Sequence, residues 1–393
     1  MEDRKRTEAI ENMTVLPINN QVFRSDAARA FADAIAGTHH DYENWICDNY
    51  IGLRAAMDVF YQEQSLNIRT ISPDVYGIPF IDCSRMARQT LLGIGAENWM
   101  ALLKNALKNG FYVILNCNEF YLPQRGATRA YDYPHSEMIH GFDEANGTFL
   151  VYGFTQNRRF ETVTADAADL IQSIETADCG MPAAFEASAN QLIFARVNQT
   201  VSYSLNRSKI IQCIRHYVQS KNLLPELYWY FGSEANVYNP SLLEKMYQVY
   251  SKENFIYGLQ CYDVAAAWFK SISNGEQPYA FPVNSLYALT EHKQCMQMRL
   301  QRFADDFGAQ AAELVRLYEE NVVDAVRIVM NLLLKHEATQ APKHLLDVPA
   351  RMHSIKEHEQ SILNAFLRMV DRGTQNIQPD EIAKDRQNRV ESL

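Results

Sequence analysis

The chain has 393 residues, of which 47% are hydrophobic and 21% are charged, and its formal net charge is −10. This composition is typical of a folded protein with two or three domains, and it excludes a disordered chain. A negative protein without a basic block repels phosphate backbones, so we expect no nucleic acid as a partner. No apolar run reaches the length of a membrane span, so we expect no membrane partner either.

The seven cysteines follow no CxxC motif and no repeated spacing. An odd, irregular set of thiols is typical of a reducing compartment, and it argues against a zinc site or a disulfide framework. Residues 1–6 are charged and no apolar segment follows them, so no secretory signal is visible. The sequence therefore predicts a cytoplasmic protein with no metal site.

Apolar residues at helical spacing predict three helices in the first part of the chain, over 25–36, 45–62 and 97–109. The second of these has its apolar face at positions 46, 50, 53 and 57. Gly110 follows the third, at the position where a left-handed residue ends a helix.

Strands are predicted next, beginning with a short apolar run over 111–115. The pair Asn146-Gly147 separates the apolar runs 138–142 and 148–154. Because both residues tolerate positive φ, this pair predicts a β-hairpin. Further strands are expected over 160–163 and 191–197.

After residue 208 only helical spacing is found, with four apolar stripes that begin near Ile210, Met296, Leu314 and Ile362. The change predicts an α+β domain over 1–200 and an all-helical domain over 201–375. Residues 376–393 are polar and are expected to form a tail.

Cys47 is the first candidate for chemistry, because it comes near the first turn of the helix predicted over 45–62. A thiolate is the nucleophile, and the partial positive charge at a helix N-terminus stabilises it. The alternative is a small apolar side chain buried for packing. Cys83 is a rival in a loop, and Cys117 at a strand end is expected to be structural.

His135 and His140 are the candidates for the base. Five residues apart on a strand, they point to opposite faces. His135 follows Pro134 at the strand entrance, where a base reaches a cleft, so we favour it over His140. A cysteine followed by a histidine on a β-hairpin is the order of the papain-like cysteine enzymes.

A third group should orient the base. In a papain-like layout it lies on the next strand, but Gly153 occupies the expected position. Asn116, Asn118 and Glu119, at the end of the neighbouring strand, are the alternatives for orienting the base or binding an oxyanion.

Several short motifs match one family. They are Asn118-Glu119-Phe120-Tyr121-Leu122-Pro123, His135 followed after five residues by Gly141-Phe142-Asp143, Phe149-Leu150-Val151, Asn49-Tyr50-Ile51-Gly52-Leu53, Leu289-Thr290-Glu291-His292-Lys293 and Asn331-Leu332-Leu333-Leu334-Lys335. In these motifs the chain resembles the butirosin biosynthesis protein H-like family, a group similar to papain-like cysteine enzymes of natural-product biosynthesis. The likeness covers residues 40–340.

The resemblance implies a cysteine-dependent acyltransferase or amide synthase. Cys47 would take an acyl group from the phosphopantetheine thioester of an acyl or peptidyl carrier protein and pass it to a small amine. His135 would be the base, and no bound cofactor is implied. An acidic carrier would need basic side chains for docking, and candidates lie near the hairpin at Arg125, Arg129, Arg158 and Arg159.

Two alternatives stay open at this stage. A papain-like peptidase or amidase would use the same two residues with water as the acceptor. A pseudoenzyme would bind a carrier protein or a pathway intermediate without chemistry, and the absence of an acid at Gly153 favours that hypothesis.

Overall fold

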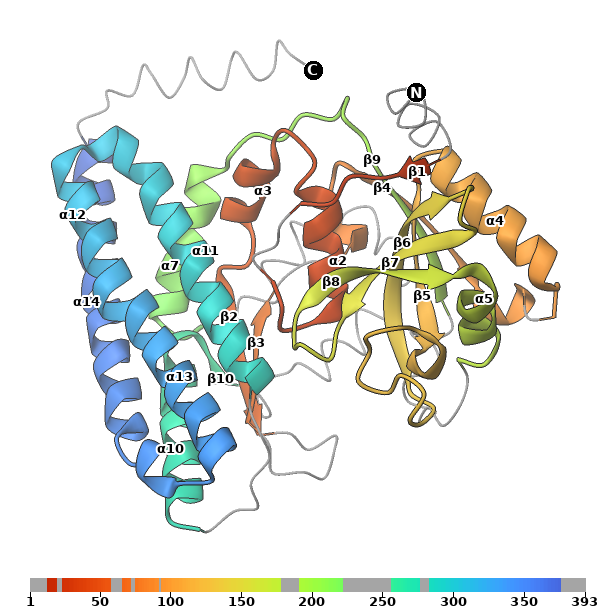
Figure 1. Ribbon diagram of the computed structural model, residues 1–393. Coiled ribbons are helices and arrows are strands. Elements are labelled where there is room, and N and C mark those ends of the chain that lie inside the picture. Colours follow the sequence, from red (N-terminus) through yellow and green to blue (C-terminus); the bar gives the residue numbers. More distant parts are fainter. Residues whose placement is uncertain are drawn as a thin grey trace, which may run out of the picture. The chain divides into compact units, whose positions relative to one another are not determined.

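The computed structural model describes residues 13–19, 23–57, 66–71, 75–91, 93–177, 191–221, 256–275 and 283–375. The chain divides into two compact units (Figure 1). Unit 1 consists of Met1–Trp45 and Pro73–Ser204, and unit 2 of Ile46–Ser72 and Leu205–Leu393. The tail predicted over 376–393 lies outside the described residues.

Unit 1 is built on a seven-stranded antiparallel sheet with the order β4-β9-β5-β6-β7-β8, in which β1 also pairs with β6. The strands are β1 (Met13–Val15), β4 (Ile81–Ala87), β5 (Tyr112–Asn118), β6 (Pro134–Asp143), β7 (Thr148–Phe154), β8 (Phe160–Asp166) and β9 (Gln191–Val197). The predicted mixture of helices and strands before residue 200 is confirmed.

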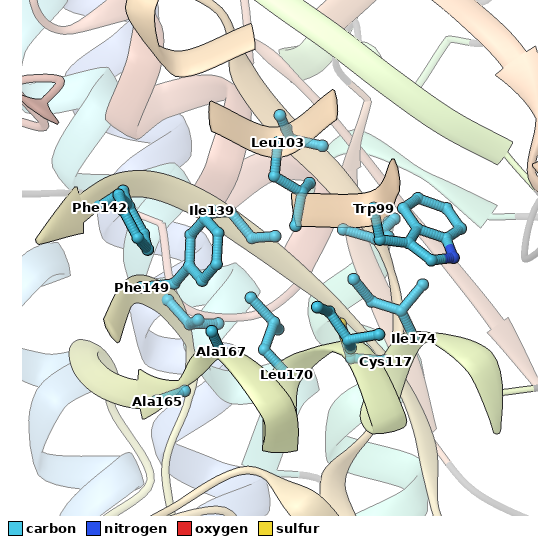
Figure 2. Packing of buried hydrophobic residues seen from close by; sticks show 14 of the residues in the cluster. Trp99, Leu103, Cys117, Ile139, Phe142, Phe149, Ala165, Ala167, Leu170 and Ile174 are labelled. Carbon is cyan, nitrogen blue, oxygen red and sulfur yellow. The ribbon is translucent and has the colours of Figure 1, made fainter. Parts of the chain in front are cut away.

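Helices cover both faces of this sheet. They are α2 (Ala27–Ala36), α4 (Ala96–Lys108) and α5 (Ala167–Glu175), with the short 3-10 helices η1 (Val75–Gly77), η2 (Arg88–Leu91) and η3 (Glu119–Tyr121). Figure 2 shows the main core, where Trp99 and Leu103 of α4 and Leu170 of α5 pack on Ile139. On the other face, Phe31 of α2 contacts Tyr152 edge to face.

The predicted hairpin between β6 and β7 is confirmed, but its turn comprises residues 144–147, and of the Asn146-Gly147 pair only Gly147 has positive φ. Gly147 has φ +65, and its N–H donates to the carbonyl oxygen of Asp143 at 2.9 Å. The Asp143 carboxylate accepts from the N–H groups of Ala145 and Asn146, which closes the turn.

One irregularity lies in β6 at His140. The pairing with β7 shifts by one residue between Ile139 and Gly141, which is a β-bulge. Because the extra residue changes the alternation of faces, Ile139 and Phe142 both lie in the core cluster although they are three residues apart.

The helix predicted over 45–62 is wrong. Helix α3 (Tyr42–Asp48) ends early, Tyr50 has φ +55, and the chain continues as β2 (Gly52–Met57). The left-handed residue turns the backbone out of the helix. Leu53 and Ala55 are then buried because alternate residues of the strand face inward.

Unit 2 has its own three-stranded antiparallel sheet, formed by β2, β3 (Leu66–Ile71) and β10 (Ile256–Tyr257). Its longer helices are α7 (Arg207–Val218), α10 (Cys261–Ser273), α11 (Val283–Phe307), α12 (Ala309–Tyr318), α13 (Asp324–Thr339) and α14 (Val348–Gln375). A π-helical turn, η6 (Glu319–Val323), joins α12 to α13.

The prediction of an all-helical second domain is therefore wrong, although its helical character after residue 205 is confirmed. Two strands come from residues before the expected boundary. Ser285 of α11 holds β3, since its Oγ donates to the carbonyl oxygen of Leu66 at 2.5 Å and accepts from the N–H of Ile68 at 3.0 Å. Side-chain bonds of this kind between distant segments are not visible in a local pattern.

The core of unit 2 contains a fully buried ion pair. Lys293 Nζ lies 2.8 Å from one carboxylate oxygen of Glu359 and 3.0 Å from the other. Three tyrosine hydroxyls complete the cluster, and the residues that donate to Glu359 are Tyr217, Tyr262 and Tyr318. Because each charge has partners, the pair tolerates removal from water. In the described part of the chain, no helix combines the length and apolar character needed to cross a bilayer.

Candidate functional site

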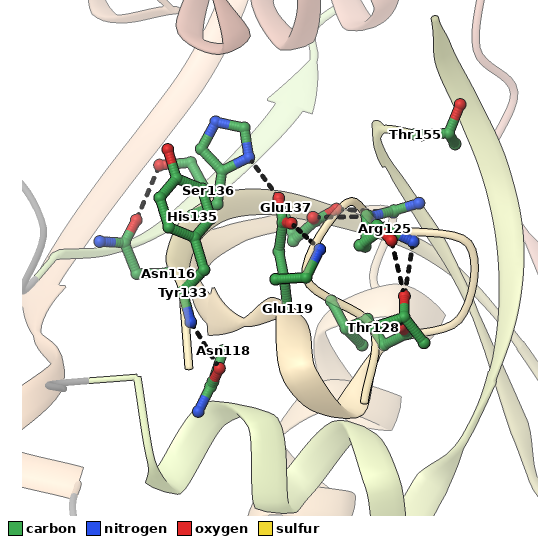
Figure 3. A network of polar contacts seen from close by, with 12 residues as sticks. Asn116, Asn118, Glu119, Arg125, Thr128, Tyr133, His135, Ser136, Glu137 and Thr155 are labelled. Carbon is green, nitrogen blue, oxygen red and sulfur yellow. Dashed lines mark hydrogen bonds and ion pairs between the residues drawn. The ribbon is translucent and has the colours of Figure 1, made fainter. Parts of the chain in front are cut away.

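The candidate site of unit 1 lies where β5 ends and β6 begins. His135 pairs with Cys117 across the two strands, and Glu119 follows β5 directly as the first residue of η3. The turn returns the Glu119 carboxylate toward β6, so that Nδ1 of His135 lies 2.9 Å from Oε1 of Glu119 (Figure 3). The sequence therefore contains an orienting acid for His135, although not on the strand where it was expected.

Backbone contacts hold Glu119 in place. Its N–H donates to the carbonyl oxygen of Tyr133 at 2.9 Å, and its second carboxylate oxygen accepts from the N–H of Ala127 at 3.4 Å. Asn118 supports the same loop, because its Oδ1 accepts from the N–H groups of Phe120 and Tyr133. Asn118 thus positions the loop and Glu119 contacts the base.

Asn116 has a different role from these two. Its Oδ1 accepts a hydrogen bond from Ser136 Oγ at 2.7 Å, and the two residues are paired across β5 and β6. Because neighbouring residues of a strand point to opposite faces, Asn116 and Ser136 lie on the other side of the sheet from Cys117 and His135. Among the three predicted orienting residues, Glu119 is therefore the one that contacts His135.

A second carboxylate, Glu137, is buried beside this pair. Arg125 donates to it through Nε at 2.8 Å and through Nη2 at 2.7 Å, and both side chains are inaccessible to solvent. A Cβ atom on Gly153, the residue opposite on β7, would lie 1.8 Å from Oε2 of Glu137. The position where an acid was expected is therefore a glycine because the Glu137 carboxylate already fills that space.

These contacts set the acid–base properties of the base. Burial disfavours the imidazolium form of His135, but the hydrogen bond to Glu119 and the charges of Glu137 and Glu119 outweigh it, so the pKa of His135 is raised above its usual value. Burial raises the pKa of Glu137, and Arg125 offsets this only in part. A raised pKa makes His135 a stronger base in its neutral form.

The His135 side chain is only partly buried. The side chain is 31% exposed, and Figure 3 shows its second ring nitrogen directed away from Glu119. When Nδ1 carries its proton toward Glu119, Nε2 of the neutral ring has a lone pair. The geometry is that of a general base fixed in one tautomer by a carboxylate.

Glu119, His135 and Glu137 also place three ligand atoms close enough to surround a cation. The charge of Glu137 is already neutralised by the bidentate Arg125, and Nδ1 of His135 faces Glu119. A metal ion would have to displace the guanidinium from a buried position, which is costly. The donor set therefore favours proton transfer over metal binding.

His140 is a structural residue. Nδ1 contacts the carbonyl oxygen of Leu16 and Nε2 contacts Thr162 Oγ1, each at 3.0 Å. Burial lowers the pKa of His140, which keeps the ring neutral near neutral pH. Both ring nitrogens of His140 have partners, and the choice of His135 as the base stays a prediction.

Cys47 does not begin a helix, and that part of the prediction is wrong. It is the second-last residue of α3 and its side chain is only 3% exposed. Its carbonyl oxygen accepts from Nε of the buried Arg299 at 2.7 Å, which places a cation at the C-terminal end of the helix. Cys47 and His135 belong to different units, so their pairing stays a prediction.

Cys117, which faces His135 across the strands, has a packing role. It is fully buried in the core cluster, and burial raises the pKa of its thiol well above the usual range. A thiol that stays protonated is a poor nucleophile. The expectation that Cys117 is structural agrees with this environment.

The four arginines proposed for carrier docking have different environments. Arg125 is buried with Glu137, so it cannot contact a partner and that prediction is wrong. Arg129 is exposed, lies 2.6 Å from Asp169, and stands over the rings of Phe120 and Tyr121. Arg158 and Arg159 are exposed in the turn between β7 and β8.

Neither the role of Glu137 nor the buried position of Arg125 was predicted from the sequence. The alternation of His135 and Glu137 on one face of β6 indicates that Glu137 is buried, but its partner Arg125 depends on how the loop before β6 folds. No protein-family model matches the chain, and no curated protein matches it. The family resemblance therefore depends on the short motifs themselves.

Proposed function

We propose that the chain is an acyltransferase in which His135, oriented by Glu119, is the general base. The observation that carries the proposal is the 2.9 Å contact between Nδ1 of His135 and Glu119, in a side chain that is 31% exposed and whose second ring nitrogen points away from Glu119 (Figure 3). A fixed imidazole of this kind removes a proton from an attacking thiol, amine or water. We also propose that unit 1 is related to papain-like enzymes, because its base stands at the entrance of a hairpin strand.

The donor in this proposal is an acyl thioester on the phosphopantetheine of a carrier protein, and the acceptor is a small amine. Cys47 would carry the acyl group between them. Its sulfur forms a bond to the acyl carbon, and the leaving carrier thiolate takes up the proton that the Cys47 thiol has lost. The amine nitrogen then bonds to the same carbon and loses one proton, which the Cys47 sulfur takes up as its bond to that carbon breaks. Transfer of the acyl group from one thiol to another changes the free energy little, whereas formation of the amide makes the reaction irreversible.

A second route needs no cysteine. The burial of Cys47 at the end of α3 favours it, because an accessible thiol is required for an acyl-enzyme. In this route His135 takes the proton of the amine, whose nitrogen attacks the carrier thioester directly. Water in place of the amine would give a hydrolase, and a carrier-binding protein without chemistry is the remaining alternative.

Intact-protein mass spectrometry separates these routes. The wild-type protein, Cys47→Ala and the control Cys83→Ala are incubated with an acyl-loaded carrier protein, with and without an amine. An acyl mass on wild type and Cys83→Ala that is absent from Cys47→Ala supports the covalent route. Amide formation by Cys47→Ala supports direct transfer. Release of the free acid alone indicates hydrolysis, and an unchanged acyl carrier in all three would refute the acyltransferase proposal.

A further inference from the structure

Three aromatic rings form a row that ends at the candidate base. Tyr131, Tyr133 and His135 are alternate residues of the segment that leads into β6. The ring centroids of Tyr131 and Tyr133 are 6.2 Å apart, and those of Tyr133 and His135 are 5.8 Å apart. Figure 3 shows the Tyr133 ring beside the His135 ring.

The two tyrosines are exposed although their backbone is fixed. Tyr131 is 58% and Tyr133 is 47% exposed, which makes them the most exposed aromatic side chains among the large hydrophobic residues of the described chain. The N–H of Tyr133 donates a hydrogen bond to Asn118 Oδ1, and its carbonyl oxygen accepts one from the N–H of Glu119. Rings on a loop that hydrogen bonds hold in place lose little conformational entropy when they bind a ligand.

The charges around this row favour a cation. The faces of tyrosine rings are electronegative, and Asp132 lies between the two tyrosines with an exposed carboxylate that Asn118 Nδ2 contacts at 2.7 Å. The nearby arginines are already engaged, Arg125 with Glu137 and Arg129 with Asp169. The whole chain carries a net charge of −10, which attracts positive ligands.

We propose that Tyr131 and Tyr133 bind the ammonium group of a cationic amine, which they present to Nε2 of His135. The identification of this amine as the acyl acceptor rests on the proposed function. The ammonium gives one proton to Nε2, and its nitrogen then attacks the acyl carbon. The second proton lost by the nitrogen goes to the leaving thiolate as the carbon–sulfur bond breaks, so the products are an amide, a thiol and an imidazolium.

Binding of choline to the whole protein, compared with its neutral isostere 3,3-dimethylbutan-1-ol, tests the cation site without any catalysis. Chemical shifts of the tyrosine and histidine rings report where each probe binds. We expect choline to bind about fivefold more tightly than the neutral alcohol. Equal affinity for the two probes, or no binding of choline, would overturn the proposal, and this comparison on the wild type requires no variant to fold.

Two double variants then assign the site. Tyr131→Phe with Tyr133→Phe keeps both ring faces and should keep the preference for choline, whereas Tyr131→Leu with Tyr133→Leu should abolish it. A preference that survives in the leucine variant would contradict the assignment. If choline binds as expected but no amide forms with any amine, the proposed function fails and the cation site stands. If amides form and the leucine variant has an unchanged KM for a cationic amine, the cation site fails and the function stands.

Discussion

Gly153 and Glu137 face each other across β6 and β7 so closely that a Cβ atom on Gly153 would lie 1.8 Å from Oε2 of the glutamate. This close approach explains why β7, the strand that follows the strand of His135, carries no acid at position 153. The buried pair of Arg125 and Glu137 occupies the space, and the acid that orients His135 comes from Glu119 at the end of β5.

The first prediction concerns this contact. Gly153→Ala should lower the free energy of unfolding by about 1–3 kcal/mol, because the added methyl group must displace one oxygen of a buried carboxylate. Chemical denaturation measures the change. Gly126→Ala is the matched control, since a Cβ there meets no atom within 4 Å and the backbone is not left-handed. Equal stability of the two variants would contradict the packing around Gly153.

The second prediction concerns the buried ion pair itself. Arg125→Met should cost about 3–5 kcal/mol of stability, because it leaves the Glu137 carboxylate buried without its partner. The double variant Arg125→Met with Glu137→Leu should recover much of this loss, since no charge is then stranded. Chemical denaturation of the single and double variants measures their free energies of unfolding. A double variant less stable than Arg125→Met would contradict the unpaired charge of Glu137 as the cause of the loss.

The third prediction concerns the base. Glu119→Gln should lower the pKa of His135, because the amide no longer stabilises the imidazolium as the carboxylate does. A pH titration of the His135 ring by NMR measures this shift, with Asp169→Asn on α5 as a control for the loss of a surface carboxylate. A pKa that is the same in Glu119→Gln and wild type would show that Glu119 does not tune the base.

The same contact has a consequence for stability. The pKa of His135 is raised in the folded state, so its protonated form favours folding. This contribution is fully present below the pKa of an unfolded histidine, about 6.5, and it is lost as pH rises through the higher folded value. The stability lost in His135→Gln should therefore be larger below that range than above it.

A fourth prediction concerns unit 2. Lys293→Met should cost about 3–5 kcal/mol, because Glu359 would stay buried without a cation. Arg316→Ala, which removes exposed pairs with Glu313 and Glu320, should cost much less stability than Lys293→Met, because water and salt screen exposed charges. Thermal or chemical unfolding of both variants gives the comparison. Similar losses at the two positions would contradict the importance assigned to the buried pair.

The elements of the fold that neighbouring residues determine could be predicted from the sequence. Asn146-Gly147 specified the hairpin, and the apolar run 191–197 is β9 residue for residue. The segment 45–62 could not be assigned in this way, because its apolar spacing fits one face of a helix. The strand formed there because Tyr50 adopts a left-handed conformation and because β2 pairs with β3, the next strand, and with the distant β10.

Part of the candidate site could also be predicted from the sequence. Pro134 before His135 indicated a strand entrance, and Glu119 was among the residues expected to orient the base. The loop that returns Arg125 to Glu137 could not be foreseen, because a buried ion pair between residues 12 positions apart leaves no periodic signal. Arg125 therefore looked like a surface charge.

The rate of amide formation as a function of pH tests the role of His135 most directly. Wild type, His135→Ala and Glu119→Gln are compared with an acyl-loaded carrier protein and a small amine. We predict that His135→Ala slows transfer about 10²–10⁴-fold and removes the rise in rate with pH that deprotonation of the imidazole gives, and that Glu119→Gln moves this rise to lower pH. Amide formation by His135→Ala at the wild-type rate and with the wild-type pH dependence would contradict the assignment of His135 as the general base.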